Sequence, residues 1–176
     1  MRREIDGVLI EVVGGNITEQ DTEAIVNAAN THLRMRSGVA GAIKVKGGED
    51  IERDAISKSP LEMSDIMVTD VGTPRRLIIH AAVMGEDLKT DEEKVSLGTE
   101  TNLIRAVEKN LSIISFPALG TGVGGFPLKA AVKAMLGTVI EYVRGHTDLT
   151  LVRFVLFDER NESMFRNVLF ELGGGD

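Results

Sequence analysis

The chain has 176 residues, of which 43% are hydrophobic and 27% are charged, and its formal net charge is −7. This composition is typical of a globular protein, and the length predicts one domain, residues 1–176, with a substantial core. The negative charge argues against a protein that holds nucleic acid by neutralising phosphates, because such binding needs clustered Lys and Arg. The sequence has no cysteine and only three scattered histidines, so we expect neither disulfides nor a metal site.

No apolar run approaches the length of a membrane span, and the first residues, MRREIDGVLIEVV, lack the long apolar core of a signal peptide. We therefore expect a cytoplasmic protein without membrane association. No residue pattern indicates a cofactor.

Hydrophobic periodicity predicts strands and helices that alternate along the chain. The predicted strands cover residues 8–13, 23–29, 66–70, 77–82, 112–118 and 150–157, and the predicted helices cover residues 41–46, 50–58, 91–110, 127–144 and 162–172. Such alternation predicts an α/β fold in which helices cover both faces of a sheet. Ligands of such sheets bind at the carboxyl ends of the strands.

A glycine-rich turn follows the predicted strand 112–118. In SFPALGTGVGGFP, residues 115–127, Gly120, Gly122 and Gly125 match the dinucleotide pattern G-x-G-x-x-G. The next helix starts later than in that fingerprint, because Pro127 favours the first helical turn. Small residues before a helix N-terminus let backbone N–H groups approach a phosphate. The alternative is a turn that only connects two elements.

A second unusual stretch is VNAANTHLRMRSGVAGAI, residues 26–43. Asn27 and Asn30 come at the end of a predicted strand, where uncharged amides suit ribose hydroxyls, although both amides could equally satisfy loop backbone. Gly38 and Gly41 then precede a predicted helix. The chain thus has two glycine-rich helix N-termini, which could hold the two phosphates of a diphosphate from opposite sides.

The motifs GNIT, EAIVNAAN, GVAGAI and FPALGTGVGGFP, in this order and at these separations, resemble a macro domain, the ADP-ribose-binding module. The resemblance covers essentially the whole chain. It implies a three-layer α/β/α sandwich around a six-stranded mixed sheet, with ADP-ribose in a cleft across the strand ends. The loop of residues 120–126 would wrap the diphosphate and the neighbouring ribose through its backbone amides.

The resemblance also implies roles for individual residues. Asn30 would hold the distal ribose, with Asn27 supporting the same loop. Asn30 and His32 are the candidate catalytic residues, and His32 is either a base or an ordinary loop residue. The positions implied to bracket the diphosphate are Gly38, Val39, Ala40, Gly41 and Ala42 on one side, and Gly120, Thr121, Gly122, Val123, Gly124 and Phe126 on the other.

The adenine end is implied to involve Asn16, Ile17 and Phe157. Asn16 stands where relatives usually have an acid that accepts a hydrogen bond from the adenine amino group, and a neutral acceptor is weaker than a charged one. Phe157 is either an aromatic ring against adenine or a core residue.

Three further departures concern the distal ribose and the phosphate loop. The sequence RMRSG replaces the usual glycine run and places Arg34, Met35, Arg36 and Ser37 near the distal ribose. Ala40 stands where MacroD-type hydrolases carry an aspartate, and Gly124 stands where an aromatic residue is common.

Three functions therefore remain open. The first is hydrolysis of an ester at the distal ribose, which would release ADP-ribose from acidic side chains or deacetylate O-acetyl-ADP-ribose. The second is a reader module that binds ADP-ribose or an ADP-ribosylated protein without turnover. The third is a binder of another nucleotide or of RNA ends.

Overall fold

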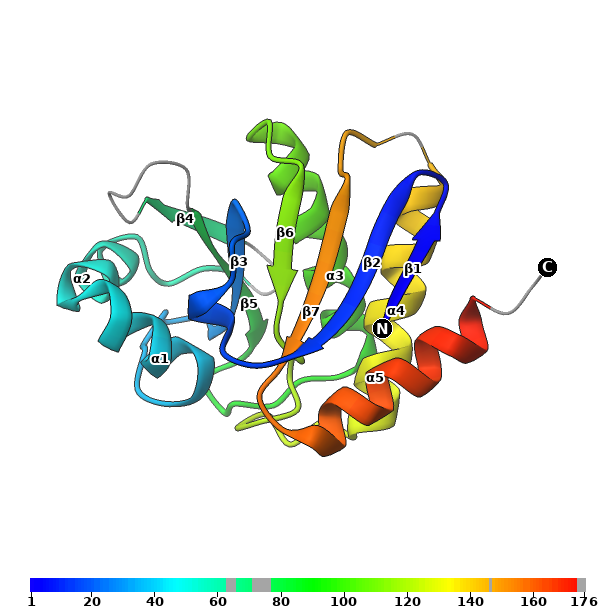
Figure 1. Cartoon of the computed structure of the whole chain (residues 1–176). Coiled ribbons are helices and arrows are strands. Elements are labelled where there is room, and N and C mark those ends of the chain that lie inside the picture. Colours follow the sequence, from blue (N-terminus) through cyan, green and yellow to red (C-terminus); the bar gives the residue numbers. More distant parts are fainter. Residues whose placement is uncertain (63–65, 71–76, 146, 174–176) are drawn as a thin grey trace.

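The structure, a computed structural model, describes residues 1–62, 66–70, 77–145 and 147–173 (Figure 1). Its elements in chain order are β1 (Arg2–Ile5), β2 (Val8–Gly14), the 3-10 turn η1 (Ile17–Glu19), β3 (Ala24–Asn30), α1 (Gly38–Gly47), α2 (Glu49–Ser57), β4 (Ile66–Asp70), β5 (Leu77–Met84), α3 (Glu92–Glu108), β6 (Ile113–Phe116), α4 (Leu128–Arg144), β7 (Leu151–Leu156) and α5 (Glu159–Leu172). No helix in these described ranges is long and apolar enough to cross a membrane.

The strands form one mixed sheet in the order β1-β2-β7-β6-β3-β5-β4. The inner strands are parallel, while the edge strands β1 and β4 are antiparallel to their neighbours. The prediction of a mixed α/β sheet is confirmed, but the described residues form seven strands in this sheet and not six. The missed strand, β1, reads RREI and lies at an edge with alternate side chains exposed, so it lacks the apolar run by which the other strands were recognised.

Helices cover both faces of the sheet, which confirms the three-layer arrangement. In Figure 1, α3 and α4 lie behind the sheet, and α1 and α2 lie together near the β4 end. The larger core joins the strands to α3, α4 and α5. Within it, the ring of Phe154 on β7 lies 5.8 Å from that of Phe116 on β6 and 5.0 Å from that of Phe165 on α5, between ring centroids. A smaller apolar cluster packs α1 and α2 on the opposite face.

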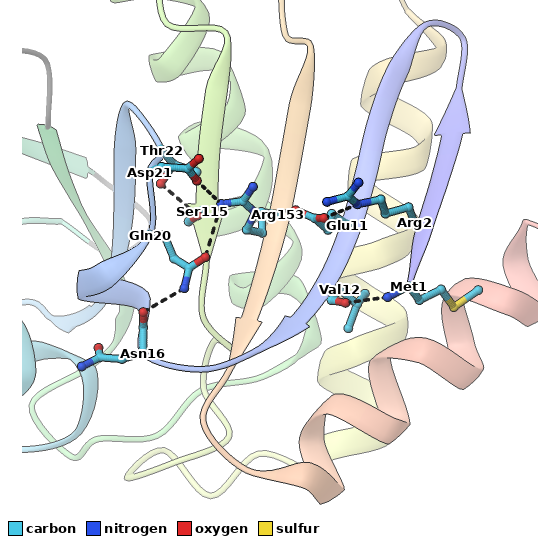
Figure 2. A network of polar contacts seen from close by, with 10 residues as sticks. All are labelled: Met1, Arg2, Glu11, Val12, Asn16, Gln20, Asp21, Thr22, Ser115 and Arg153. Atoms are coloured by element: carbon cyan, nitrogen blue, oxygen red, sulfur yellow. Dashed lines mark hydrogen bonds and ion pairs between the residues drawn. The ribbon is translucent and has the colours of Figure 1, made fainter.

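Beyond α1, this second face of β2 and β7 carries a polar network (Figure 2). Glu11, which is only 3% exposed, contacts both Arg2 and Arg153. Burial would raise the pKa of the Glu11 carboxyl, but the hydrogen bonds from the two arginines outweigh it and hold that pKa below its ordinary value. Arg153 also donates to Gln20 and Asp21, in the segment that links η1 to β3. The network therefore ties η1 to the centre of the sheet.

Candidate ligand-binding cleft

The two predicted glycine-rich segments lie at the same edge of the sheet. One segment follows β3 and leads into α1, and the other follows β6 and leads into α4. Because β3 and β6 are parallel neighbours, their carboxyl ends meet at that edge. Two cavities are lined by parts of both segments.

The first of these, the Phe157 cavity, has a volume of about 430 Å³. Its walls include Asn16 and Ile17 from η1, residues 155–157 from the end of β7, and Asn161 from α5. Val39, Thr121 and Gly122 line it where the glycine-rich segments approach. The Phe157 side chain is 92% exposed, so its interpretation as a core residue is wrong. An exposed ring beside apolar walls can stack against a planar base.

The second, the Asn30 cavity, has a volume of about 450 Å³ and a more polar wall. Among the residues that line it are Asn30, His32, Arg34, Arg36, Ser37, Ala40, Glu86 and Val123. Ala40 and Val123 bring the two glycine-rich segments to this cavity as well. The cationic side chains here favour an anionic or hydroxyl-rich ligand.

Asn30 is oriented by its own loop. Its Oδ1 accepts a hydrogen bond from the backbone N–H of His32 at 3.0 Å, and its Nδ2 lies 3.5 Å from the carbonyl oxygen of Arg34. The His32 Nε2 lies 2.8 Å from Oε1 of Glu86, and its Nδ1 lies 3.4 Å from the hydroxyl of Thr31. Both ring nitrogens of His32 thus have protein neighbours.

Asn27, in contrast, lies in the interior and lines neither cavity. It is 1% exposed, and its Nδ2 donates to Nδ1 of His80 at 3.0 Å. The Nε2 of His80 lies 3.1 Å from the Thr69 hydroxyl. Burial lowers the pKa of His80 to about 4, so the ring is neutral at pH 7. Because Nδ1 accepts from Asn27, the single ring hydrogen lies on Nε2, which donates it to Thr69. Asn27 therefore supports the end of β3 from inside the sheet.

The first turn of α1 offers backbone donors to the space between the cavities. The N–H of Gly41 donates to the carbonyl oxygen of Ser37 at 3.1 Å, whereas the earlier N–H groups of a helix have no partner inside it. The donors are therefore those of Gly38, Val39 and Ala40. Gly41 itself lines neither cavity, and a Cβ at this position would lie 3.5 Å from the Arg36 backbone.

The glycine loop is closed by its own backbone. The N–H of Gly125 donates to the carbonyl oxygen of Gly122 at 3.1 Å, and the N–H of Phe126 donates to that of Gly120 at 3.0 Å. Gly120 and Gly125 have φ of 74° and 60°, a region that favours glycine. A Cβ at Gly124 would come within 2.8 Å of the Gly120 carbonyl oxygen.

The loop residues differ in what they reach. Thr121 and Gly122 line the Phe157 cavity and Val123 lines the Asn30 cavity. Phe126, which packs partly against the large core, lines neither, and Gly120 and Gly124 shape the turn. The loop thus places backbone between the two cavities, opposite the start of α1.

The RMRSG stretch divides between cleft and core. Arg34, Arg36 and Ser37 line the Asn30 cavity. Met35 is only 2% exposed, and its N–H donates to Oε1 of Glu52 at 2.8 Å, so it does not reach the cleft. The Lys44 ammonium and then the Met35 N–H hold the pKa of Glu52 below its ordinary value. Glu52 thereby fixes this stretch against α2.

Comparison with known proteins identifies the family. The macro domain model matches residues 26–135. The chain belongs to the macro domain family. A protein of Aquifex aeolicus is 39% identical to this macro domain over 85% of the chain and 89% of that protein. A Mycobacterium tuberculosis protein is 36% identical over 89% of the chain, but the chain spans only 43% of its length.

A solved structure shows the same fold. The macrodomain of Oceanobacillus iheyensis, as a point mutant with ADP-ribose, is 32% identical to this macro domain, with a TM-score of 0.90 and coverage of 99% of both chains.

Two polar residues of this macro domain's cleft, Glu86 and Asn161, were not predicted from the sequence. Glu86 follows the carboxyl end of β5, the strand that pairs with β3, and it meets His32 in the Asn30 cavity. Glu86 and His32 meet because β3 and β5 are neighbours in the sheet, and the sequence alone does not indicate this pairing. In the described part of the chain, no three His, Asp or Glu side chains gather as metal ligands.

Proposed function

We propose that this macro domain binds ADP-ribose across the cleft, as one domain spanning residues 1–176. Adenine would occupy the Phe157 cavity, the diphosphate would lie between α1 and the glycine loop, and the distal ribose would occupy the Asn30 cavity. The observation that carries this proposal is that two cavities lie on either side of the first turn of α1. This arrangement suits a ligand with a group at each end and an anionic centre that binds the N–H groups of the helix start. The Oceanobacillus macrodomain, whose fold is so similar, is a complex with ADP-ribose.

We further propose that an ester on the distal ribose is hydrolysed in the Asn30 cavity. The substrate would be an ADP-ribosylated acidic side chain of a protein or O-acetyl-ADP-ribose. Water would add to the ester carbonyl carbon, the ribose oxygen would leave as a hydroxyl with a proton, and a carboxylic acid would be released. Asn30 would hold the ribose, and the substrate's diphosphate would orient the water, a contribution of position rather than of a protein base.

The surroundings of His32 support this division of roles. Its Nε2 lies 2.8 Å from Oε1 of Glu86 and its Nδ1 lies 3.4 Å from the Thr31 hydroxyl, so both ring nitrogens have protein neighbours. Ala40 supplies no carboxylate to the same cavity. Positioning by Asn30 is the mechanism that the available groups favour.

The test is hydrolysis of an ADP-ribosylated glutamate peptide and of O-acetyl-ADP-ribose by the wild type, Asn30→Ala and His32→Ala. Asn30→Ala is expected to lose most turnover, while His32→Ala keeps much of it. An inactive His32→Ala variant that still binds ADP-ribose would replace the phosphate-assisted mechanism with a histidine base.

The second candidate is a reader that binds ADP-ribose without turnover. It is favoured by one observation, that Ala40 stands in the Asn30 cavity where a carboxylate would serve as a base. A wild-type protein that binds ADP-ribose but hydrolyses neither ester would establish this function instead.

A further inference from the structure

The orientation of the Asn16 side-chain amide is set by its own turn. Asn16 caps η1, and its Oδ1 accepts hydrogen bonds from the backbone N–H of Thr18 at 3.0 Å and from the Thr18 hydroxyl at 2.9 Å. A backbone N–H can only donate, so the amide oxygen must face Thr18. A carbonyl oxygen has two lone pairs, and both are engaged here. The atom expected to accept from adenine is therefore already in use.

The remaining group of Asn16 is its NH2, which can only donate. The turn that carries it is held in place, because the Gln20 side chain donates to the Asn16 carbonyl oxygen at 3.0 Å and Arg153 donates to Gln20. Figure 2 shows the Asn16 side chain projecting from η1 away from this network. Asn16 also lines the Phe157 cavity, so a fixed donor is presented at the wall beside the exposed ring.

We infer that this cavity selects a base with a carbonyl oxygen at the position facing Asn16, a 6-oxopurine such as hypoxanthine, over adenine. The inference rests on the proposed function, since it assigns the base end of the same ligand. Adenine presents an amino group at position 6, and two donors that face each other make no hydrogen bond. A 6-oxopurine presents an acceptor at that position and completes the pair.

Two alternatives within the cavity do not remove this selection. Turning the Asn16 amide over would place its NH2 against the Thr18 N–H and lose the cap. The other amide at this end, Asn161, uses its backbone N–H to bond Asp158, and none of the described hydrogen bonds involves its side chain. A side chain that can rotate offers either a donor or an acceptor, so Asn161 does not discriminate between bases.

The experiment measures dissociation constants of ADP-ribose and inosine diphosphate ribose, which differ only in the base, for the wild type and Asn16→Asp. Asp is as good a cap as Asn, and one carboxylate oxygen keeps the Thr18 bonds while the other replaces the NH2 with an acceptor. The wild type is expected to bind the inosine ligand roughly 3- to 10-fold more tightly, the effect of a single hydrogen bond. Asn16→Asp is expected to reverse the order.

Only the ratio of the two constants is used, because the added carboxylate can weaken both ligands through the diphosphate. As a control, Asn161→Ala is expected to weaken both ligands and leave the ratio unchanged. Asn16→Ser keeps a capping oxygen without the NH2 and should bring the ratio close to one, which serves if Asn16→Asp does not fold.

The possible failures are distinct. A wild type that binds ADP-ribose as tightly as the inosine ligand, or more tightly, overturns the base assignment and leaves the proposed function in place. A folded wild type that binds neither ligand overturns the proposed function itself.

Discussion

Gly122→Glu places a negative charge where the diphosphate is proposed to lie, without straining the fold. A Cβ built at Gly122 meets no atom within 4 Å, and Gly122 is not among the glycines with positive φ. Gly122 and Val39 of α1 line the same cavity, so a carboxylate at residue 122 is expected to lie near the proposed ligand. The variant therefore changes the electrostatics of the cleft and leaves the packing alone.

The size of the effect follows from Coulomb's law. A carboxylate about 6 Å from each of two phosphate charges, with an effective dielectric constant of about 40 to 80, is repelled by about 1.4 to 2.8 kcal/mol in total. This corresponds to roughly a 10- to 100-fold rise in the dissociation constant for ADP-ribose. The rise should shrink as the salt concentration increases, because the two groups meet near solvent.

The assay is calorimetric titration with ADP-ribose at low and high salt. Gly137→Glu is the matched control, since Gly137 lies in the middle of α4, also has open space at its Cβ position and takes the same change in charge. The control should bind like the wild type. If a folded Gly122→Glu protein also binds like the wild type, the loop does not cradle the diphosphate.

Three further predictions concern stacking, pH and the polar network. Phe157→Ala should weaken ADP-ribose binding more than Asn16→Ala, because the exposed ring offers a stacking surface, whereas the Asn16 NH2 makes no hydrogen bond with the amino group of adenine. Equal losses by calorimetry would contradict this. Because the folded-state pKa of His80 is about 4 instead of 6.5, its contribution to the free energy of unfolding is complete above pH 6.5 and declines as pH falls toward 4, by about 3 kcal/mol in all. The free energies of unfolding of the wild type and His80→Gln, measured by urea unfolding, should therefore draw closer by this amount as the pH falls over that range. Parallel pH profiles of the two proteins would argue against a neutral buried ring. Arg153→Met should lower the free energy of unfolding by about 3–5 kcal/mol, since it leaves the buried Glu11 with the exposed Arg2 as its one cationic partner among the residues that the structure describes. Adding Glu11→Gln should restore part of the lost stability. If the effects of the two substitutions simply add, Glu11 and Arg153 are not coupled.

The order of strands and helices could be predicted because most strands are continuous apolar runs and most helices have an apolar face. The missed β1 did leave one signal in the sequence, because the pair Asp6-Gly7 favours a two-residue hairpin turn. The structure has that turn between β1 and β2, with φ of 47° at Asp6 and 83° at Gly7. Helix starts were less predictable. The last helix begins at Glu159 instead of residue 162, because Asp158 accepts a hydrogen bond from the Asn161 N–H at 2.8 Å and caps it.

The two asparagines of the VNAAN stretch were grouped, although their spacing separates them. Side chains three positions apart in a strand leave opposite faces of the sheet. Ala28 and Asn30 accordingly line the same cavity, and Asn27 turns inward to His80. This division was present in the sequence.

Gly41 shows the effect of an error in a helix start. The sequence placed the start of α1 at residue 41, where its N–H would be free, but α1 begins at Gly38 and the Gly41 N–H bonds to Ser37. The free donors therefore lie three residues earlier. The contact between His32 and Glu86 had no such sequence signal, because it depends on how two separate loops fold over one sheet edge.

The measurement that tests the cleft most directly is a titration of the isotope-labelled protein with ADP-ribose, followed by the NMR shifts of its backbone amides. If ADP-ribose binds across the cleft, residues 38–40 and 121–124 should show saturable shifts, together with Ile17 at one end and Asn30 at the other. No saturable binding, or shifts confined to residues outside the two cavities and the segments between them, would contradict it.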